Sequence, residues 1–286
     1  RPRRARAEKP KVSAFLSAKI DQILALKPDA VFGFSDLQAD IASALIRAGV
    51  QVTVFNQRSV EEIFSVLFQI AAMVDRAQQG KALLAQMRAE IDRHQAIAQA
   101  WPVRPKVYFE EWDEPRISAI QWVSELIALA GGDDVFPHLA QQALGKDRIL
   151  ADDQPIIQAA PDIVIGSWCG KKFRPEKVAQ RAGWQDVPAV RNGQLFEIKS
   201  ADILQPGPAA LTDGVAQLHQ LEGVEGALLQ LRLRLAAAEH PLHREVHVLV
   251  AREPGQQRMV LEHHGAFRRR AADLTAIADQ CSARGP

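Results

Sequence analysis

The spacing of apolar residues predicts one long helix near the middle of the chain. Between residues 81 and 98 they recur every three or four positions, with charged residues between them, at Leu83, Leu84, Met87, Ile91 and Ala98. Pro102 and Pro105 end the pattern. About 25 residues at roughly 1.5 Å each give a rod of about 38 Å, which is longer than one globular domain needs. The capping-box pair Ser59 and Glu62 predicts a shorter helix just before it.

The first part of the chain predicts a strand, a helix and a second strand. An apolar run at residues 30–34 follows the stop signal Lys27-Pro28-Asp29, and Ser35 can cap a helix that continues to about Ala48. A second apolar run covers residues 50–55. This order favours a parallel pair of strands.

The second half repeats the same order of residue types. Residues 155–168 give an apolar helix, Pro-Asp, an apolar strand, a glycine and an aromatic residue, as residues 23–34 do. A strand at residues 106–109, a loop at residues 110–115 and a helix that ends at Gly131-Gly132 precede the repeat. We therefore expect an α/β protein with two similar lobes, one on each side of the long helix.

Composition excludes several other classes of protein. The 286 residues include 35 Lys and Arg against 34 Asp and Glu, so a net charge of +1 indicates no general attraction to nucleic acid. No run of 18 apolar residues predicts a membrane span, and no signal-peptide pattern is visible. Cys169 and Cys281 form no disulfide framework. Five histidines between residues 240 and 264 match no closed metal site, so we expect no metal.

The order of these segments resembles the substrate-binding proteins of ABC importers that carry cobalamin, haem or ferric siderophores. The segments are residues 23–34, 48–50, 125–132, 161–166 and 191–193. Residues 110–115 (EEWDEP), 166–171 (GSWCGK) and 202–208 (DILQPGP) are most similar to the cobalamin-binding members. The resemblance implies two Rossmann-like lobes joined by one long backbone helix.

The expected organisation has four parts. They are an N-terminal lobe at residues 10–74, a connecting helix at 75–101, a C-terminal lobe at 102–223 and an unassigned extension at 224–286. Family members usually begin with a further strand and helix before the segment that resembles residues 10–15, so the N-terminal lobe is expected to be incomplete. The extension has no counterpart in the family.

The resemblance implies a ligand held between the lobes, at the carboxyl ends of the strands. A corrin is a broad apolar disc fringed by amides, so aromatic faces and polar anchors suit it. The expected faces are Phe15, Phe34, Trp112 and Trp168, with Phe109 beside them, and the expected acceptors are Glu110, Glu111 and Asp113. Cobalamin would be a transported ligand, and no resident cofactor is expected.

The resemblance also implies docking to a membrane permease through an acidic residue on each lobe. In the first lobe this position falls at Asp40, with Asp36 as the alternative. In the second it falls at Gln205, which carries no charge, so Asp202 is the alternative. The protein is expected to be periplasmic and monomeric.

Other interpretations compete with this one. Haem usually needs a Tyr or His axial ligand, and the only tyrosine, Tyr108, lies inside a predicted strand. Ferric siderophores favour arginines, whereas residues 110–114 are mostly acidic. An enzyme could use Cys169, which has no visible His partner, or the pair Glu110 and Asp113. A scaffold or truncated product that binds no ligand is the third alternative, and Phe15, Phe34 and residues 110–114 would then be core or solvated loop.

Overall fold

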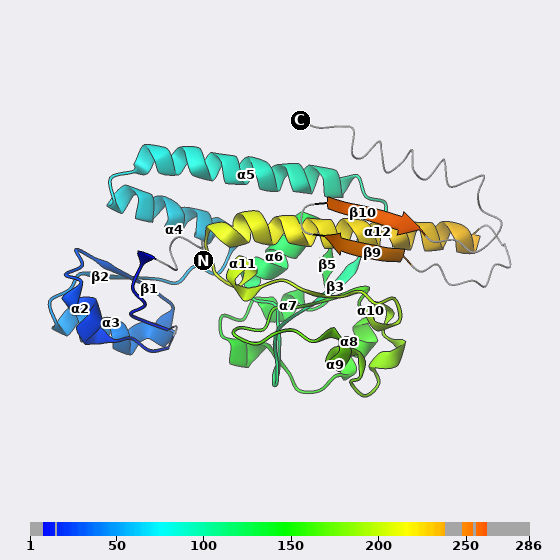
Figure 1. Ribbon diagram of the computed structural model, residues 1–286, viewed down its shortest axis with the longest axis horizontal. Helices are drawn as coiled ribbons and strands as arrows, with labels where there is room; N and C mark the ends of the chain where they lie inside the picture. Colours follow the sequence, from blue (N-terminus) through cyan, green and yellow to red (C-terminus); the bar gives the residue numbers. More distant parts are fainter. Residues whose placement is uncertain (1–7, 15, 238–247, 254–255, 262–286) are drawn as a thin grey trace. The chain divides into compact units, whose positions relative to one another are not determined.

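The computed structural model describes residues 8–14, 16–237, 248–253 and 256–261 (Figure 1). Phe15, one of the predicted ligand-binding residues, lies outside the described residues. The chain divides into two compact units, residues 1–234 and 235–286. Each unit is described by itself below.

The N-terminal lobe contains a parallel pair of strands, β1 (Val31–Phe34) and β2 (Val52–Phe55), in a register that pairs Val31 with Val52. The helix α3 (Ala39–Arg47) connects the two strands, and α2 (Ile20–Ala25) and the 3-10 turn η1 (Asp36–Gln38) lie before it. This is the predicted strand-helix-strand unit. Among the described residues its sheet has two strands.

Two helices follow this lobe, α4 (Val60–Met73) and α5 (Ala77–Gln99), and α5 is the predicted long helix. Ser59 accepts a hydrogen bond from the backbone of Glu62, whose carboxylate accepts one from the backbone of Ser59, so the capping box is present. The two helices pack closely, because a Cβ on Gly80 would lie only 2.5 Å from the Cβ of Ala71. Figure 1 shows them side by side.

The C-terminal lobe is built on a six-stranded mixed sheet. Its main order is β6-β4-β3-β7-β8, and β5 pairs with β3. Strands β3, β5, β7 and β8 pair in parallel, whereas β4 is antiparallel to both β3 and β6. The strands are β3 (Lys106–Asp113), β4 (Arg116–Ser118), β5 (Asp133–Asp134), β6 (Ile149–Leu150), β7 (Ile163–Gly166) and β8 (Leu195–Glu197).

Short helices and turns connect these strands. Helix α6 (Gln121–Ala130) ends at Gly131, whose φ of 119° places it in the left-handed region that favours glycine. The others are α7 (Pro137–Ala140), η2 (Gly145–Arg148), α8 (Gln154–Ala159), α9 (Pro175–Ala179), η3 (Trp184–Asp186), α10 (Pro188–Arg191) and α11 (Ser200–Ile203).

The chain then enters a π-helical turn, η4 (Ala210–Gly214), and the long helix α12 (Val215–Ala237). The suggested lobe boundary at 223/224 falls inside α12. In the second unit, β9 (Val248–Glu253) and β10 (Gln256–Leu261) form an antiparallel pair.

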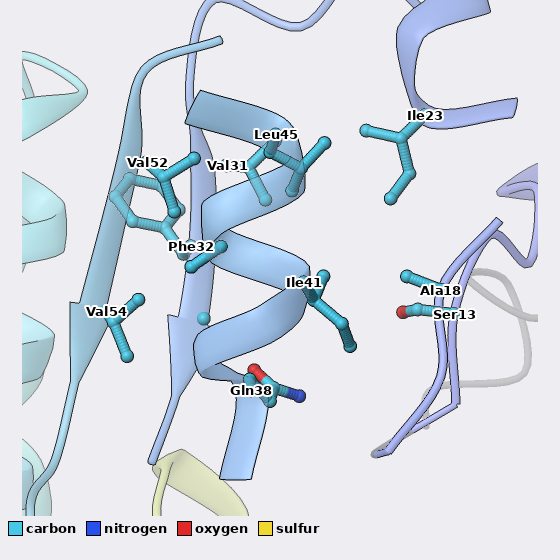
Figure 2. Close-up of a pocket in the computed structure, with 12 residues that line it drawn as sticks. Ser13, Ala18, Ile23, Val31, Phe32, Gln38, Ile41, Leu45, Val52 and Val54 are labelled. Atoms are coloured by element: carbon cyan, nitrogen blue, oxygen red, sulfur yellow. The ribbon is translucent and has the colours of Figure 1, made fainter. Parts of the chain in front are cut away.

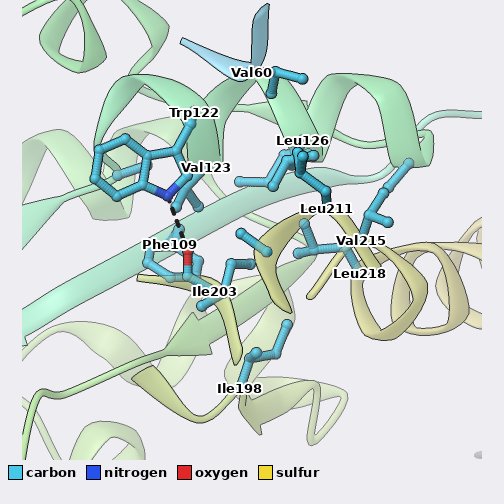
Figure 3. Close-up of a cluster of buried hydrophobic side chains, with 14 of the residues drawn as sticks. Val60, Phe109, Trp122, Val123, Leu126, Ile198, Ile203, Leu211, Val215 and Leu218 are labelled. Atoms are coloured by element: carbon cyan, nitrogen blue, oxygen red, sulfur yellow. Dashed lines mark hydrogen bonds between the residues drawn. The ribbon is translucent and has the colours of Figure 1, made fainter. Parts of the chain in front are cut away.

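Alternate residues of the central strands supply two hydrophobic clusters, one on each face of the sheet. Ile163 and Ile165 belong to the cluster that also holds Val60 of α4 and the start of α12. Val164 belongs to the other, with Tyr108 and Trp168. Figure 3 shows the first cluster, in which Trp122 Nε1 donates a hydrogen bond to Ile203 O at 2.9 Å.

The predicted loop at residues 110–115 is wrong for most of its length. Strand β3 continues to Asp113, and a turn at Glu114–Pro115 leads into β4. The backbone of residues 110–113 is held by antiparallel pairing with residues 116–118, with a bulge between Glu110 and Trp112. The short partner strand β4, which begins at Arg116, left no clear pattern in the sequence.

Candidate functional site

The two lobes meet at the carboxyl ends of their strands, where α/β sheets bind ligands. Val60 N donates to Glu125 Oε2 at 2.6 Å, and Gln57 Nε2 donates to Pro206 O at 3.0 Å. The Phe34 ring lies edge-on to the Trp122 ring, with centroids 6.4 Å apart. We call this region, together with the end of β3, the junction, and it comprises residues 34–36, 56–60, 111–113, 122–125 and 203–206.

Arg58 is the central cation on the N-terminal side of the junction. Its guanidinium lies 5.1 Å from the centre of the Phe34 ring and donates to Asn56 Oδ1 at 2.8 Å. Only 14% of its side chain is exposed. Burial lowers the pKa of Arg58, the charge of Asp36 opposes this, and the charge of Arg148 adds to it. Charged side chains of both lobes therefore influence the pKa of Arg58.

The turn after β1 holds Asp36 beside this arginine. Ser35 is buried, has a φ of 71° and donates through its backbone N to Phe55 O at 2.8 Å. Its hydroxyl donates to Asp36 Oδ1 at 2.7 Å, and this bond is the main cause that lowers the pKa of Asp36. The Asp36 carboxylate lies 4.0 Å from Arg58 Nη2 and is largely exposed. It is therefore ionised and open to a partner.

A buried ion pair faces this side from the C-terminal lobe. Arg148 Nη1 lies 2.7 Å from Glu111 Oε2 and also donates to Ser118 O. Arg148 is buried, whereas about a quarter of Glu111 is exposed. The charge of Glu111 acts on Arg58 as well. The junction thus contains two arginines and two carboxylates whose charges interact.

A half-buried aromatic side chain, Trp112, lies at the end of β3. Lys171 Nζ lies 2.5 Å from Asp113 Oδ2 and within 5.6 Å of the centre of the Trp112 ring. Trp112 is half-buried, and its Nε1 donates to Glu114 O at 2.9 Å. The same lysine lies 5.2 Å from the Trp168 ring. This arrangement fixes one face of Trp112 against a cation.

Glu110 points away from this surface into the lobe. It has no exposed surface, and Arg181 binds it through two nitrogens at 2.7 and 2.8 Å. Tyr108 and Trp168 also donate to it, at 3.0 and 3.1 Å. Burial, together with the Glu110 carboxylate, raises the pKa of Tyr108 well above its ordinary value. Glu110 therefore organises the core of the C-terminal lobe.

The predicted ligand-binding residues divide into two groups by burial. Phe34, Glu111, Trp112 and Asp113 are partly exposed. Phe109 and Glu110 have no exposed surface, and Trp168 is 4% exposed. Direct contact stays a prediction for both groups, and in this conformation the first group has the larger exposed surface for it.

The predicted docking residues also differ. Asp36 is exposed in η1, and Asp40 is exposed in the first turn of α3. Gln205 is exposed after α11, whereas Asp202 is half-buried, with Gln217 Nε2 at 3.4 Å from its Oδ2. Docking through these residues stays a prediction.

Sequence reasoning missed the two arginines of the junction. Arg58 follows the carboxyl end of β2 by three residues, so the rule that ligands bind at strand ends could have indicated it. Arg148 lies in η2, more than 30 residues after Glu111, and no local pattern connects the two. Only the folded sheet brings them together.

Two hollows lie elsewhere in the described part of the chain. One of about 80 Å³ lies in the N-terminal lobe, where Figure 2 shows Ile41 and Leu45 of α3 facing Ser13, Ala18 and Ile23. Another of about 340 Å³ lies between α5 and the η4–α12 turn, lined by Leu83, Gln86, Met87, Glu90, Thr212, Asp213 and Ala216. The first is too small for a large cofactor, and neither contains a predicted ligand-binding residue.

No group of three or more His, Cys, Asp or Glu side chains placed to hold a metal ion occurs among the described residues. In the same residues, no helix is long and apolar enough to cross a membrane.

Comparison with protein families gives one decisive match. The family described as periplasmic binding protein matches residues 1–201, which is more than two thirds of the chain. The chain belongs to the periplasmic binding protein family. The resemblance noted from the sequence is thereby confirmed, as is the α/β fold class.

Three relatives illustrate how this periplasmic binding protein compares. A vitamin B12-binding protein of Vibrio parahaemolyticus serotype O3:K6 is 24% identical over 221 residues, which are 75% of this chain and 76% of the relative. The crystal structure of the periplasmic vitamin B12-binding protein BtuF of Vibrio cholerae is 18% identical with a TM-score of 0.58, covering 77% of this chain and 84% of that one. A periplasmic heme-binding protein from Pseudomonas aeruginosa is 20% identical with a TM-score of 0.65, covering 77% and 81%. At these identities the solved structures show the fold alone.

Proposed function

We propose that this periplasmic binding protein is the substrate-binding component of an ABC importer and carries cobalamin or a related corrinoid at the junction. It would act in the periplasm as a monomer that binds its ligand without chemical change and delivers it to a membrane permease.

The names of the curated relatives support the corrinoid. Two relatives, 24% and 22% identical to this chain, are named vitamin B12-binding proteins. The solved structures do not distinguish the ligand, because heme-binding and B12-binding proteins both share the fold.

The single observation that carries the proposal is the composition of the junction. Phe34 and Arg58 lie on its N-terminal side and Glu111 on its C-terminal side, and Trp112 and Asp113 follow Glu111 at the end of β3. The amide fringe of a corrin both donates and accepts hydrogen bonds, so carboxylates and a guanidinium can each bind part of it. Its broad apolar disc suits the aromatic faces.

The burial of Tyr108 supports a corrinoid over haem. Tyr108 is the only tyrosine of the chain, has no exposed surface and donates its hydroxyl to Glu110. Among the described residues the histidines are His94, His138 and His219, on α5, α7 and α12, and none belongs to the junction. No axial ligand for haem iron is therefore available there from the described residues.

Arg58 favours a second candidate, an anionic iron complex such as a ferric siderophore. Its Nε atom is buried without a hydrogen-bond partner among the described residues. Guanidinium groups bind carboxylates and other anions strongly. The acidic neighbours Asp36 and Glu111 offset this charge, which is why we place the corrinoid first.

Delivery would use the exposed acidic surface of the N-terminal lobe. Asp40 and Asp36 are exposed and free to meet arginines on a permease. On the other lobe Asp202 is half-buried and Gln205 is uncharged, so docking there would depend more on hydrogen bonds than on charge.

One titration tests the proposal. Cyanocobalamin, haemin and a ferric siderophore are each added to the full chain, and binding is followed by calorimetry and tryptophan fluorescence. We expect micromolar or tighter binding of cyanocobalamin alone, which corresponds to about −8 kcal/mol or better. Binding of haemin or the siderophore in its place would overturn the choice of ligand. No binding of any of the three would overturn the proposal.

A further inference from the structure

Two histidines pack ring against ring where α12 lies on α5. His94 of α5 and His219 of α12 have ring centroids 4.5 Å apart, and Trp101 stacks on the other side of His219 at 4.9 Å. His94 is 7% exposed, and neither of its ring nitrogens has a hydrogen-bond partner among the described residues. His219 Nδ1 lies 2.9 Å from Ala130 O, so Nδ1 carries the proton.

Two glycines fix the position of the Trp101 ring. A Cβ on Gly223 of α12 would lie 2.9 Å from Trp101 Cζ2, and a Cβ on Gly131 would collide with the same ring. Both approaches are closer than a carbon pair tolerates. The stack is therefore a close-packed contact between α5, the end of α6 and α12.

Among the described residues, Glu90 is the one carboxylate that favours a protonated imidazole in this stack. From α5, Glu90 Oε1 lies 3.5 Å from His94 Nε2, but Glu90 is already paired with Arg93 on the same helix. Arg93 acts unfavourably on protonated forms of both histidines.

From α12, Glu222 has no exposed surface, and burial raises its pKa well above the ordinary value. Glu225 of α12 is buried as well, and Arg104 and Asp133, which act on Glu222, bind each other at 2.8 Å. An imidazolium in the stack would thus be buried with little compensation.

Burial lowers the pKa of both histidines, and for His94 the charge of His219 adds to this effect. These lowered pKa values determine the direction in which stability changes with pH. A histidine whose folded pKa is depressed contributes stability that is fully present above its unfolded pKa of about 6.5 and is lost as the pH falls below it.

We propose that the stack of His94, His219 and Trp101 is an acid-sensitive latch, which holds α12 against α5 near neutral pH and releases it when the imidazoles take up protons. Its place in the fold gives the release a defined reach. Val215 and Leu218 belong to the hydrophobic core and Leu221 packs against it, whereas α12 continues to residue 237. The part of α12 after Leu221 is the part that is freed.

Hydrogen exchange of the full chain tests the latch. The amides of residues 222–237 are compared at pH 7.5 and pH 5.0, after correction for intrinsic exchange rates. We expect loss of protection at pH 5.0 of roughly tenfold for each unit by which the histidine pKa is lowered. The amides of β3 and β7 in the same sample should keep their protection.

Two substitutions of one residue separate a titration effect from a packing effect. His219→Gln keeps a donor for Ala130 O, and His219→Phe keeps an aromatic ring against Trp101, and neither can be protonated. In both variants the pH-dependent loss of protection should decrease strongly. His138→Gln removes an exposed histidine of α7 and serves as the matched control with the wild-type response.

Nuclear magnetic resonance of the histidine rings gives an independent readout. We expect His94 to titrate below 6.5 in the wild type and to move towards 6.5 in His219→Gln, because the charge of His219 is then absent. The latch is overturned if His94 titrates at or above 6.5, or if protection in residues 222–237 is the same at both pH values. It is also overturned if both His219 variants respond to acid as the wild type does.

Discussion

Strands β1 and β7 have a similar pattern of residue types but different surroundings. Each follows Pro-Asp and ends with a glycine and an aromatic residue close by. Strand β7 lies between β3 and β8, and all four of its residues are buried. Strand β1 pairs with β2 alone among the described residues, and Phe32 in its middle is 39% exposed.

The difference shows that a local pattern specifies a strand but does not specify its burial. Val31 and Val164 occupy equivalent positions of the repeat, yet Val164 has no exposed surface and Val31 is partly exposed. Neighbouring strands and the helices over each face decide this. The C-terminal lobe therefore carries the larger share of the core, and the same change should cost more there.

The largest expected effect comes from breaking the buried ion pair of the C-terminal lobe. Arg181→Met leaves the Glu110 carboxylate, which has no exposed surface, without its cation. We expect a loss of about 3–5 kcal/mol in the free energy of unfolding, measured by urea denaturation.

The matched change in the N-terminal lobe is Arg58→Met, whose partner Asp36 is 4.0 Å away and largely exposed. This variant should lose less stability, since the Asp36 carboxylate that it leaves unpaired is exposed to solvent. Equal losses in the two variants would show that the lobes do not differ as described.

A smaller effect is expected at the two equivalent glycines. A Cβ on Gly166 would lie 1.9 Å from Cδ2 of Phe173, so Gly166→Ala requires the aromatic ring to move. We expect a loss of about 3 kcal/mol, near the upper end for overpacking of a core, measured by thermal or urea unfolding.

Gly33→Ala is the control for this change. Its Cβ would lie 3.2 Å from Gln38 Oε1 and 3.4 Å from Val54 Cγ2, where small shifts suffice. The expected loss is below about 1 kcal/mol. A Gly33→Ala variant as unstable as Gly166→Ala would mean that β1 is packed as tightly as β7.

The sequence predicted the parts of the fold that depend on local patterns. The capping box at Ser59 placed the start of α4, and the apolar spacing up to Ala98 placed α5. These features depend on hydrogen bonds and periodicity within one helix, which neighbouring residues determine.

Features that depend on distant partners were not predictable in the same way. The pairing of β3 with β4, and the ion pair between Glu111 and Arg148, exist only once the sheet has formed. Glu110 and Trp168 were predicted to contact the ligand. In the structure Trp168 donates a hydrogen bond to Glu110 inside the C-terminal lobe. A sequence shows that such residues can bind a ligand, but not whether other side chains already bind them.

The central claim is that a corrinoid contacts both lobes at the junction, and one set of affinities tests it most directly. Cyanocobalamin affinity is measured by calorimetry for the wild type, Phe34→Ala in β1 and Trp112→Ala in β3. Phe32→Ala is the control, because Phe32 belongs to the same strand as Phe34 but stacks on Phe55 at 5.9 Å, outside the junction. We expect Phe34→Ala and Trp112→Ala each to weaken binding by about 1–3 kcal/mol and Phe32→Ala to leave it unchanged. Wild-type affinity in both junction variants, or an equal loss in Phe32→Ala, would contradict the claim.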